Sequence, residues 1–130
     1  INKRYQLVNE QGIYMTSAQR LKLIKTHVNF REMGGSWLRQ KREQITKPNG
    51  KQLTQHDIAN IIGISSSGYI SAIESGGPSV PEDRWDDYAD ALHIERELFR
   101  RNMVMFYLPK TYSAFAGEPT KEQLKNGLLK

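Results

Sequence analysis

Residues 53–76, LTQHDIANIIGISSSGYISAIESG, contain two short amphipathic patterns separated by one glycine. Thr54 is followed three residues later by Asp57, which is the spacing of a capping box with Asp in place of the usual Glu or Gln. The next apolar positions predict one buried helical stripe, made of Ile58, Ala59, Ile61 and Ile62. Gly63 is suited to end this helix because glycine adopts a positive φ at no steric cost. The sequence therefore predicts a short helix that stops abruptly.

A second short helix follows this turn. Ser65 or Ser66 supplies its N-cap, and the residues at 69, 70 and 73 give it an apolar inner face. Gly76 and Gly77 close it. A helix that ends at a glycine, a short turn, and a second helix with small polar residues at its start together predict a helix-turn-helix. The small residues Ala59 and Gly63 permit the two helices to cross closely.

Other helices are predicted on both sides of this unit. The pair Gly34–Gly35 is expected to end a preceding helix, and Ser36 to cap the next one from Trp37 onward. Pro48, Asn49 and Gly50 break that helix and predict an exposed loop over 45–51. Pro81 fits a first helical position, and a fourth core helix follows with one face formed by Trp85, Tyr88, Ala89 and Leu92.

A further helix is predicted over residues 95–107. Its apolar band, Leu98, Phe99, Met103, Met105 and Phe106, is wider than one face needs, so part of it is expected to meet another surface. Pro109 ends this helix. Residues 117–130 are expected to form a weakly ordered tail with a short helix.

The N-terminal residues predict an extension outside this helical domain. Residues 4–16 contain two stretches of β-forming residues around Asn9–Gly12, which favours a β-hairpin. Ser17 then caps a helix predicted to run to about His27. The expected organisation is an N-terminal extension at 1–33, a helical domain at 34–108 and a C-terminal tail at 109–130, with an all-α domain at its centre.

Charge is unevenly distributed over the 130 residues. The formal net charge is +5, and it is the balance of +4 over 1–33, +3 over 34–60, −5 over 61–92 and +3 over 93–130. The basic blocks favour a polyanionic partner, although an excess of this size is also common on ordinary soluble surfaces. The chain has no cysteine and no apolar run long enough to cross a bilayer, so we expect a cytoplasmic protein without membrane contact.

The helical segment resembles a known family, the Cro/CI-type helix-turn-helix domains, also called XRE-like or lambda-repressor-like. The resemblance covers roughly residues 35–94 and is carried by Trp37–Glu43, Leu53–Gln55, Ile58–Ala59, Gly63, Tyr69–Ser71, Ile73–Gly76 and Ala91–Leu92. It implies a five-helix bundle that usually acts as a dimer on a near-palindromic operator. It also implies double-stranded DNA as the partner, with the protein associated with the nucleoid when bound.

The resemblance implies roles for particular residues. Gln55, at the start of the first helix of the motif, would anchor a phosphate. Ile70 and Ile73 would be core residues, and Glu74 a structural acid. The full set of candidate DNA-binding residues is Arg39, Arg42, Lys51, Thr54, Gln55, Ser66, Ser67, Gly68, Tyr69, Ser71, Ala72 and Ser75.

Two features of the sequence affect this interpretation, and the first departs from the family pattern. Ten residues separate Arg42 from Leu53, where the family usually has about four, so the loop around 47–52 is an insertion. The second helix also lacks an exposed Arg, Asn or Gln that could pair with a base edge in bidentate fashion. Direct readout should therefore be modest. Three alternatives remain. The missing readout is supplied by the Lys47–Lys51 loop, the Arg39–Arg42 face or the N-terminal segment. Otherwise the protein binds DNA with low sequence specificity, or the helix-turn-helix binds a protein.

Catalytic and metal-binding chemistry finds little support in the sequence. The three histidines are far apart and have no second ligand at metal-site spacing. The serines at 65–67 lie outside any G-x-S-x-G pattern, and capping explains them. Asp86 and Asp87 diverge by about 100° on a helix, which favours a solvated face over a Mg²⁺ site. We expect a protein without enzymatic activity that binds neither a cofactor nor a metal ion.

Two hypotheses for the function follow. The first is a sequence-specific, dimeric transcriptional regulator, a repressor that reads an inverted repeat with the helix at about 66–75, with half-sites about 34 Å apart. The second is an antitoxin-like or adaptor protein that binds a partner protein through its termini, at residues 1–33 or the 95–107 helix, and binds DNA secondarily.

Overall fold

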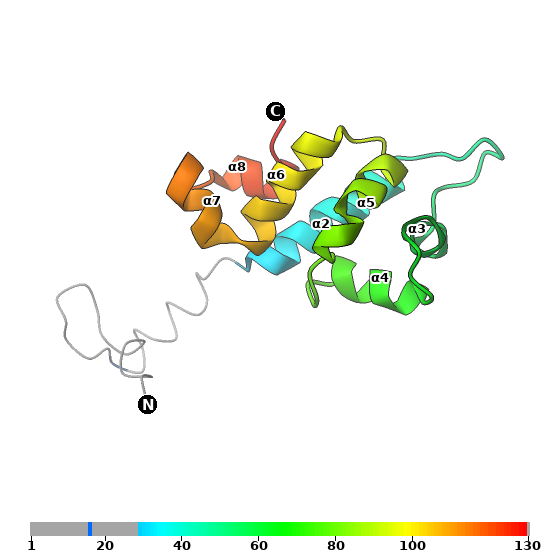
Figure 1. The fold of residues 1–130 in the computed structure, drawn as a ribbon, viewed down its shortest axis with the longest axis horizontal. Helices are drawn as coiled ribbons and strands as arrows, with labels where there is room; N and C mark the ends of the chain where they lie inside the picture. The colour runs from blue at the N-terminus through cyan, green and yellow to red at the C-terminus, as the bar shows by residue number, and fades with distance from the viewer. Residues whose placement is uncertain (1–15, 17–28, 130) are drawn as a thin grey trace.

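The computed structural model describes Thr16 and residues 29–129, and within this part the fold is all-helical (Figure 1). Its elements in chain order are α2 (Phe30–Glu43), α3 (Gln55–Ile62), α4 (Ser67–Glu74), the 3₁₀ helix η2 (Glu82–Arg84), α5 (Trp85–Ala91), α6 (Arg96–Tyr107), α7 (Pro109–Ala116) and α8 (Lys121–Asn126). The all-α prediction is confirmed for these residues. The predicted helix at 17–27 and, apart from Thr16, the predicted hairpin lie outside the described residues. No described helix combines the length and apolar character needed to span a bilayer.

The prediction that Gly34 and Gly35 end a helix is wrong, because both lie inside α2. This helix starts after Asn29, whose side chain accepts a hydrogen bond from the Glu32 amide. A Cβ on Gly35 would stand 2.6 Å from the Glu74 carbonyl oxygen, and one on Gly34 would stand 2.8 Å from the Cβ of Phe106. The glycines therefore let α2 pack closely against α4 and α6, and Ser36 is an exposed helical residue, not a cap.

The core is centred on α6, which packs between α2 and α5. Trp37 of α2 lies 6.1 Å from Phe99 and 5.8 Å from Phe106 between ring centroids, and Tyr88 of α5 stacks on Phe99 at 5.7 Å. Such pairs add about 0.5–1.5 kcal/mol beyond their burial. The members of the α6 band most fully buried are Phe99, Met103, Met105 and Phe106, each 0% exposed. These four residues face the interior, whereas Leu98, the fifth member of the band, is half-buried.

The C-terminal segment is folded onto this core, in contrast to the predicted tail. Thr120 caps α8 with a capping box, and Leu124 and Leu128 are buried. The indole of Trp37 donates to the Asn126 carbonyl at 3.1 Å, and the fully buried Asn102 accepts from the Leu128 amide at 2.8 Å. A buried amide side chain requires such partners, so Asn102 gives the segment a specific docking position.

Candidate nucleic-acid interface

The α3–α4 unit is built from local signals that the sequence displays. The Thr54 hydroxyl accepts from the Asp57 amide at 3.0 Å, and the Thr54 amide donates to the Asp57 carboxylate at 2.9 Å, which completes the predicted capping box. Gly63 ends α3 in the left-handed region with a φ of 76°. Ser66 caps α4, as one of the two predicted alternatives. Gly63 therefore defines the end of α3, and Ser66 defines the start of α4, on the two sides of the turn.

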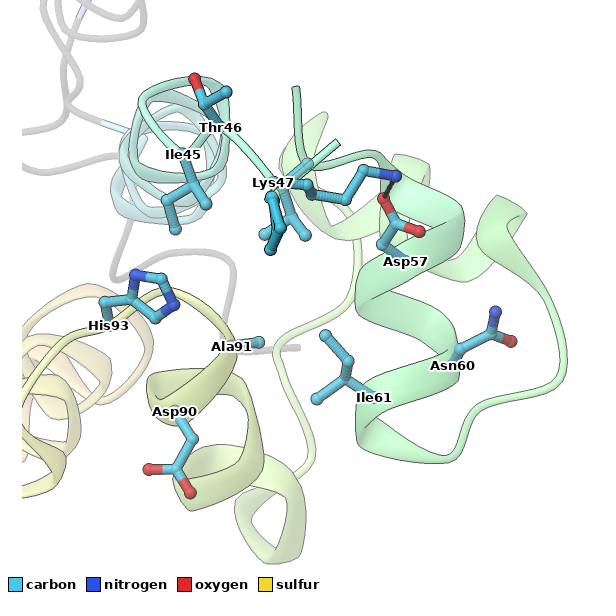
Figure 2. Close-up of a pocket in the computed structure, with 11 residues that line it drawn as sticks. Ile45, Thr46, Lys47, Asp57, Asn60, Ile61, Asp90, Ala91 and His93 are labelled. Atoms are coloured by element: carbon cyan, nitrogen blue, oxygen red, sulfur yellow. Dashed lines mark ion pairs between the residues drawn. The ribbon is translucent and has the colours of Figure 1, made fainter. Parts of the chain in front are cut away.

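One predicted core residue of α3 lies at the surface. Ile58, Ala59 and Ile62 are buried as expected, but Ile61 is 49% exposed. It lines a groove of about 480 Å³ between α3, the 45–52 loop and the end of α5 (Figure 2). Ile61 faces this groove because it lies about 100° around the helix from Ile62, which points into the core.

The acidic side chains in this groove are each paired with a cation. Asp57 lies 2.9 Å from the Lys47 ammonium (Figure 2). Asp90 is bound by Arg96 at 2.7 Å. Hydrogen bonding to Lys47, supported by Thr54, holds the pKa of Asp57 well below its usual value. In the described part of the chain, no three His, Cys, Asp or Glu side chains gather as metal ligands. The groove therefore shows no constellation for metal chemistry.

The loop between α2 and α3 is an ordered hairpin turn beside the start of α3. Thr46 and Gln52 form an isolated antiparallel bridge, and the Gly50 amide donates to the Lys47 carbonyl at 2.8 Å. Gly50 has a φ of 83°, which favours glycine there. Lys47 ties the turn to α3 through Asp57, while Lys51 is exposed just before the α3 cap. The loop thus presents one lysine to solvent and uses the other to contact α3.

The outward face of α4 is composed of small residues. Gly68, Ser71 and Ser75 are exposed, and Ser67 and Ala72 are half-buried. Four of these predicted site residues belong to α4, and the fifth, Ser75, is its C-cap. None of them has a side chain that extends more than two heavy atoms beyond Cα. A macromolecule that binds this face can therefore approach the helix backbone closely.

Two other predicted site residues on α4 are engaged within the protein. The Ser66 hydroxyl accepts from the Gly68 amide at 3.1 Å as the N-cap of the helix. The Tyr69 ring is half-buried against the core, and its hydroxyl donates to the Ser79 carbonyl at 3.5 Å. Tyr69 therefore helps to hold the segment that follows α4.

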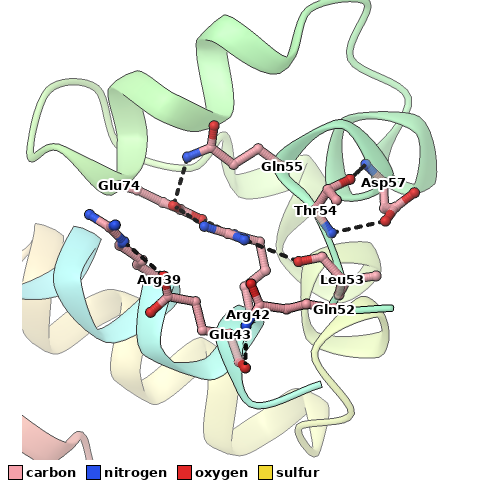
Figure 3. A network of polar contacts seen from close by, with 9 residues as sticks. All are labelled: Arg39, Arg42, Glu43, Gln52, Leu53, Thr54, Gln55, Asp57 and Glu74. Atoms are coloured by element: carbon pink, nitrogen blue, oxygen red, sulfur yellow. Dashed lines mark hydrogen bonds and ion pairs between the residues drawn. The ribbon is translucent and has the colours of Figure 1, made fainter. Parts of the chain in front are cut away.

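The structure gives Arg42 an internal position instead of the expected contact surface (Figure 3). Its guanidinium donates to both carboxylate oxygens of Glu74, at 2.8 and 3.0 Å, and to the Leu53 carbonyl at 3.0 Å. The hydrogen bonds to Glu74 raise the pKa of Arg42 above its ordinary value. The two side chains are 9% and 3% exposed. A guanidinium so enclosed is not available to a phosphate, because its fork is already bound to a carboxylate.

Gln55 and Arg39 occupy the edge of this network (Figure 3). The Gln55 amide donates to Glu74 at 2.9 Å from a half-buried position, so it joins the start of α3 to the end of α4. Arg39 is exposed and pairs with Glu43 at 3.2 Å, one turn along α2. An exposed pair of this kind contributes little to stability and opens readily, so Arg39 remains accessible.

Glu74 is the central residue of this network, and the sequence predicted only that it is structural. A signal for its partner exists. Glu74 follows Ile70 by four residues and so belongs to the buried stripe of α4, where a carboxylate requires a cation. Arg42 occupies the corresponding place on α2, four residues after Leu38. Two opposite charges on two buried stripes form a natural pair, although 32 residues separate them.

The arrangement defines a class: a small helical protein in which two short helices, joined at a glycine turn, present small polar residues outward beside an exposed lysine. No protein-family model matches the chain, and no curated protein matches it either. Its function is therefore inferred from the residues themselves and from the positions that α2 to α6 give them.

Proposed function

We propose that the protein is a sequence-specific, DNA-binding regulator of transcription that acts as a dimeric repressor on an inverted-repeat operator. In this proposal α2 to α6 form a five-helix, lambda-repressor-like bundle in which α3 and α4 are the helix-turn-helix. α4 enters the major groove, and the start of α3 lies over the phosphate backbone. Repression follows because the bound protein excludes RNA polymerase.

The observation that carries the proposal is the outward face of α4. A helix fits a groove about 12 Å wide, and small outward residues let its backbone approach the base edges. Glu74 at the end of α4 and Asp57 at the start of α3 are each paired with a cation within 3 Å. Repulsion between these groups and the phosphates is thereby reduced.

Different residues have different tasks in this mechanism. Lys51 and Gln55 contact phosphates and position the protein without reading sequence. The hydroxyls of Ser71 and Ser75 reach base edges, and Ala72 contacts a thymine methyl group. Short side chains distinguish base pairs weakly, so the shape and deformability of the operator contribute a large share of the specificity.

A second candidate is an antitoxin-like or adaptor protein that binds DNA secondarily. The short side chains on α4 favour it, because a helix without long readout groups is a poor sole source of affinity. Under this alternative a partner protein supplies the main binding energy.

The experiment that tests the proposal is selection of bound duplexes from a random library at roughly 150 mM salt, where nonspecific affinity is already weak. We expect an enriched inverted repeat, whose half-site separation reports the geometry of the dimer. Ser71→Glu adds one negative charge to the outward face of α4 and should abolish enrichment. Lys121→Gln makes the same change of charge on exposed α8 and is the matched control.

Two results would count against the proposal. If the unaltered protein enriches no sequence, the alternative candidate is favoured and a protein partner should be sought. If Ser71→Glu enriches the same repeat as the unaltered protein, α4 is not the helix that reads DNA.

A further inference from the structure

An apolar groove with an exposed aromatic ring lies between α6 and α7. The groove has a volume of about 290 Å³, and its lining includes Val104, Tyr112, Phe115 and Ala116. Phe115 is 88% exposed, which is the largest exposure of any large apolar side chain in the described residues. A phenylalanine this exposed beside an apolar groove marks an interaction surface, because water solvates both poorly.

The rim of this groove carries charges of both signs. Glu97 and Arg101 lie one turn apart on the exposed side of α6, and neither forms an ion pair with another of the described residues. The neighbouring Arg100 differs, because its guanidinium is held by Asp86 at 2.6 Å. One acid and one base that form no ion pair with the described residues therefore border the apolar surface, and Arg101 is in addition attracted electrostatically by Glu95.

We propose that this α6–α7 surface binds a second copy of the chain through a two-fold axis. Phe115 of each copy enters the partner's groove, and Glu97 of each copy faces the partner's Arg101. A two-fold interface requires a self-complementary patch, and this patch contains both the projecting ring and the groove, and both the acid and the base. A partner of a single charge would match only half of the rim.

The position of α7 in the fold agrees with this arrangement. Figure 1 shows α7 and α8 at one end of the described fold and α3 at the opposite end. A second copy joined at α7 therefore leaves the outward face of α4 free on both copies. The inference deepens the proposed function, which requires a dimer, but it is tested without DNA, so that the two can fail separately.

The test is analytical ultracentrifugation of the full chain without DNA over a range of concentrations. We expect the mass to rise from 15.0 kDa toward twice that value as the concentration increases. Phe115→Asp should weaken dimerisation by at least about 30-fold, as expected for a central aromatic anchor of an interface. Leu129→Asp, which changes another exposed apolar residue (81%) outside this groove, is the control and should leave the dimer unchanged.

The charged rim gives a second set of variants that does not depend on Phe115. Glu97→Arg and Arg101→Glu should each weaken the dimer by several-fold, and the double exchange should restore it because the two charges then face each other in reverse. Circular dichroism should show unchanged folding, since both side chains are exposed.

Three results would overturn the inference. A monomer up to about 100 µM would exclude an interface of ordinary strength at this surface. A dimer unaffected by Phe115→Asp would place the contact elsewhere. Failure of the double exchange to restore a dimer that both single changes weaken would contradict the two-fold pairing of Glu97 with Arg101.

Discussion

The buried ion pair between Arg42 and Glu74 allows a quantitative test of what holds α2 and α4 together. Arg42→Met keeps the length of the side chain but leaves the Glu74 carboxylate, 3% exposed, with Gln55 as its remaining side-chain donor. The Leu53 carbonyl also loses its guanidinium partner. Removal of one member of a buried pair costs about 3–5 kcal/mol, so we expect the free energy of unfolding to fall by about 4 kcal/mol.

Urea unfolding, followed by far-ultraviolet circular dichroism, measures this loss directly. At roughly 4 °C per kcal/mol for a domain of this size, the Tm should fall by about 15 °C. Arg42→Met combined with Glu74→Leu should recover all but about 1–2 kcal/mol, because an apolar pair commonly replaces a buried ion pair at little cost. Arg39→Met removes the exposed pair with Glu43 and, as the control, should cost about 0.5 kcal/mol or less.

One result would refute the internal role of Arg42. If Arg42→Met retains the stability of the unaltered protein but binds every DNA sequence more weakly, with a salt dependence shallower by about one counterion, then Arg42 contacts a phosphate. A loss of stability together with an unchanged salt dependence supports the buried position. The two outcomes are separable because the free energy of unfolding and the salt dependence of DNA binding are independent quantities, measured in separate experiments.

Three further predictions concern packing, pH and binding. Gly35→Ala should lower the free energy of unfolding by about 2–3 kcal/mol in urea titrations, because its Cβ would lie 2.6 Å from the Glu74 carbonyl oxygen. Gly68→Ala, whose Cβ meets only the Ser66 hydroxyl at 3.2 Å, should be neutral or stabilising, and equal losses at both glycines would contradict this packing. The pKa of Asp57 is lowered in the folded state, so its contribution to stability is present above the usual value of 3.8 and is lost as the pH falls toward the folded value. The stability difference between the unaltered protein and Asp57→Asn should therefore shrink between about pH 5 and pH 2 in thermal melts. A difference independent of pH would refute this prediction. Lys51→Gln should weaken binding to the selected operator and to random duplex by the same factor in titrations at several salt concentrations, and a loss confined to the operator would assign Lys51 a base contact.

The elements that the sequence predicted correctly are those determined by neighbouring residues. The capping box at Thr54, the left-handed Gly63 and the serine cap of α4 each involve residues at most three positions apart. Such signals act before any tertiary contact forms, so a single sequence displays them. The start and end of α3 and the start of α4 follow from them.

Apart from Ile61, whose position around α3 places it at the surface, the incorrect predictions depend on contacts with distant residues. Gly34 and Gly35 read locally as a helix stop, yet they are retained in α2 because α4 and α6 approach too closely for a side chain. The charge of Arg42 suggests a surface position despite its place on the buried stripe of α2, and Glu74, 32 residues away, makes it internal. The C-terminal residues have the composition of a tail, but Asn102 and Trp37 bind their backbone. Local composition does not encode such partners.

The internal network and the outward face of α4 are connected by a physical requirement. Long side chains can adjust to a misplaced helix, whereas the one- and two-atom side chains on α4 reach a ligand only if its backbone is held close and in one orientation. Gln55 joins α3 to Glu74 at 2.9 Å, Arg42 joins Glu74 to α2, and Gly35 brings the end of α4 against the α2 backbone. These contacts fix α4 at its C-terminal end, and the Gly63 turn fixes it at the other. A helix that recognises a ligand through such short side chains requires this rigidity, because a displacement of the helix by about 1 Å exceeds the tolerance of direct hydrogen bonds.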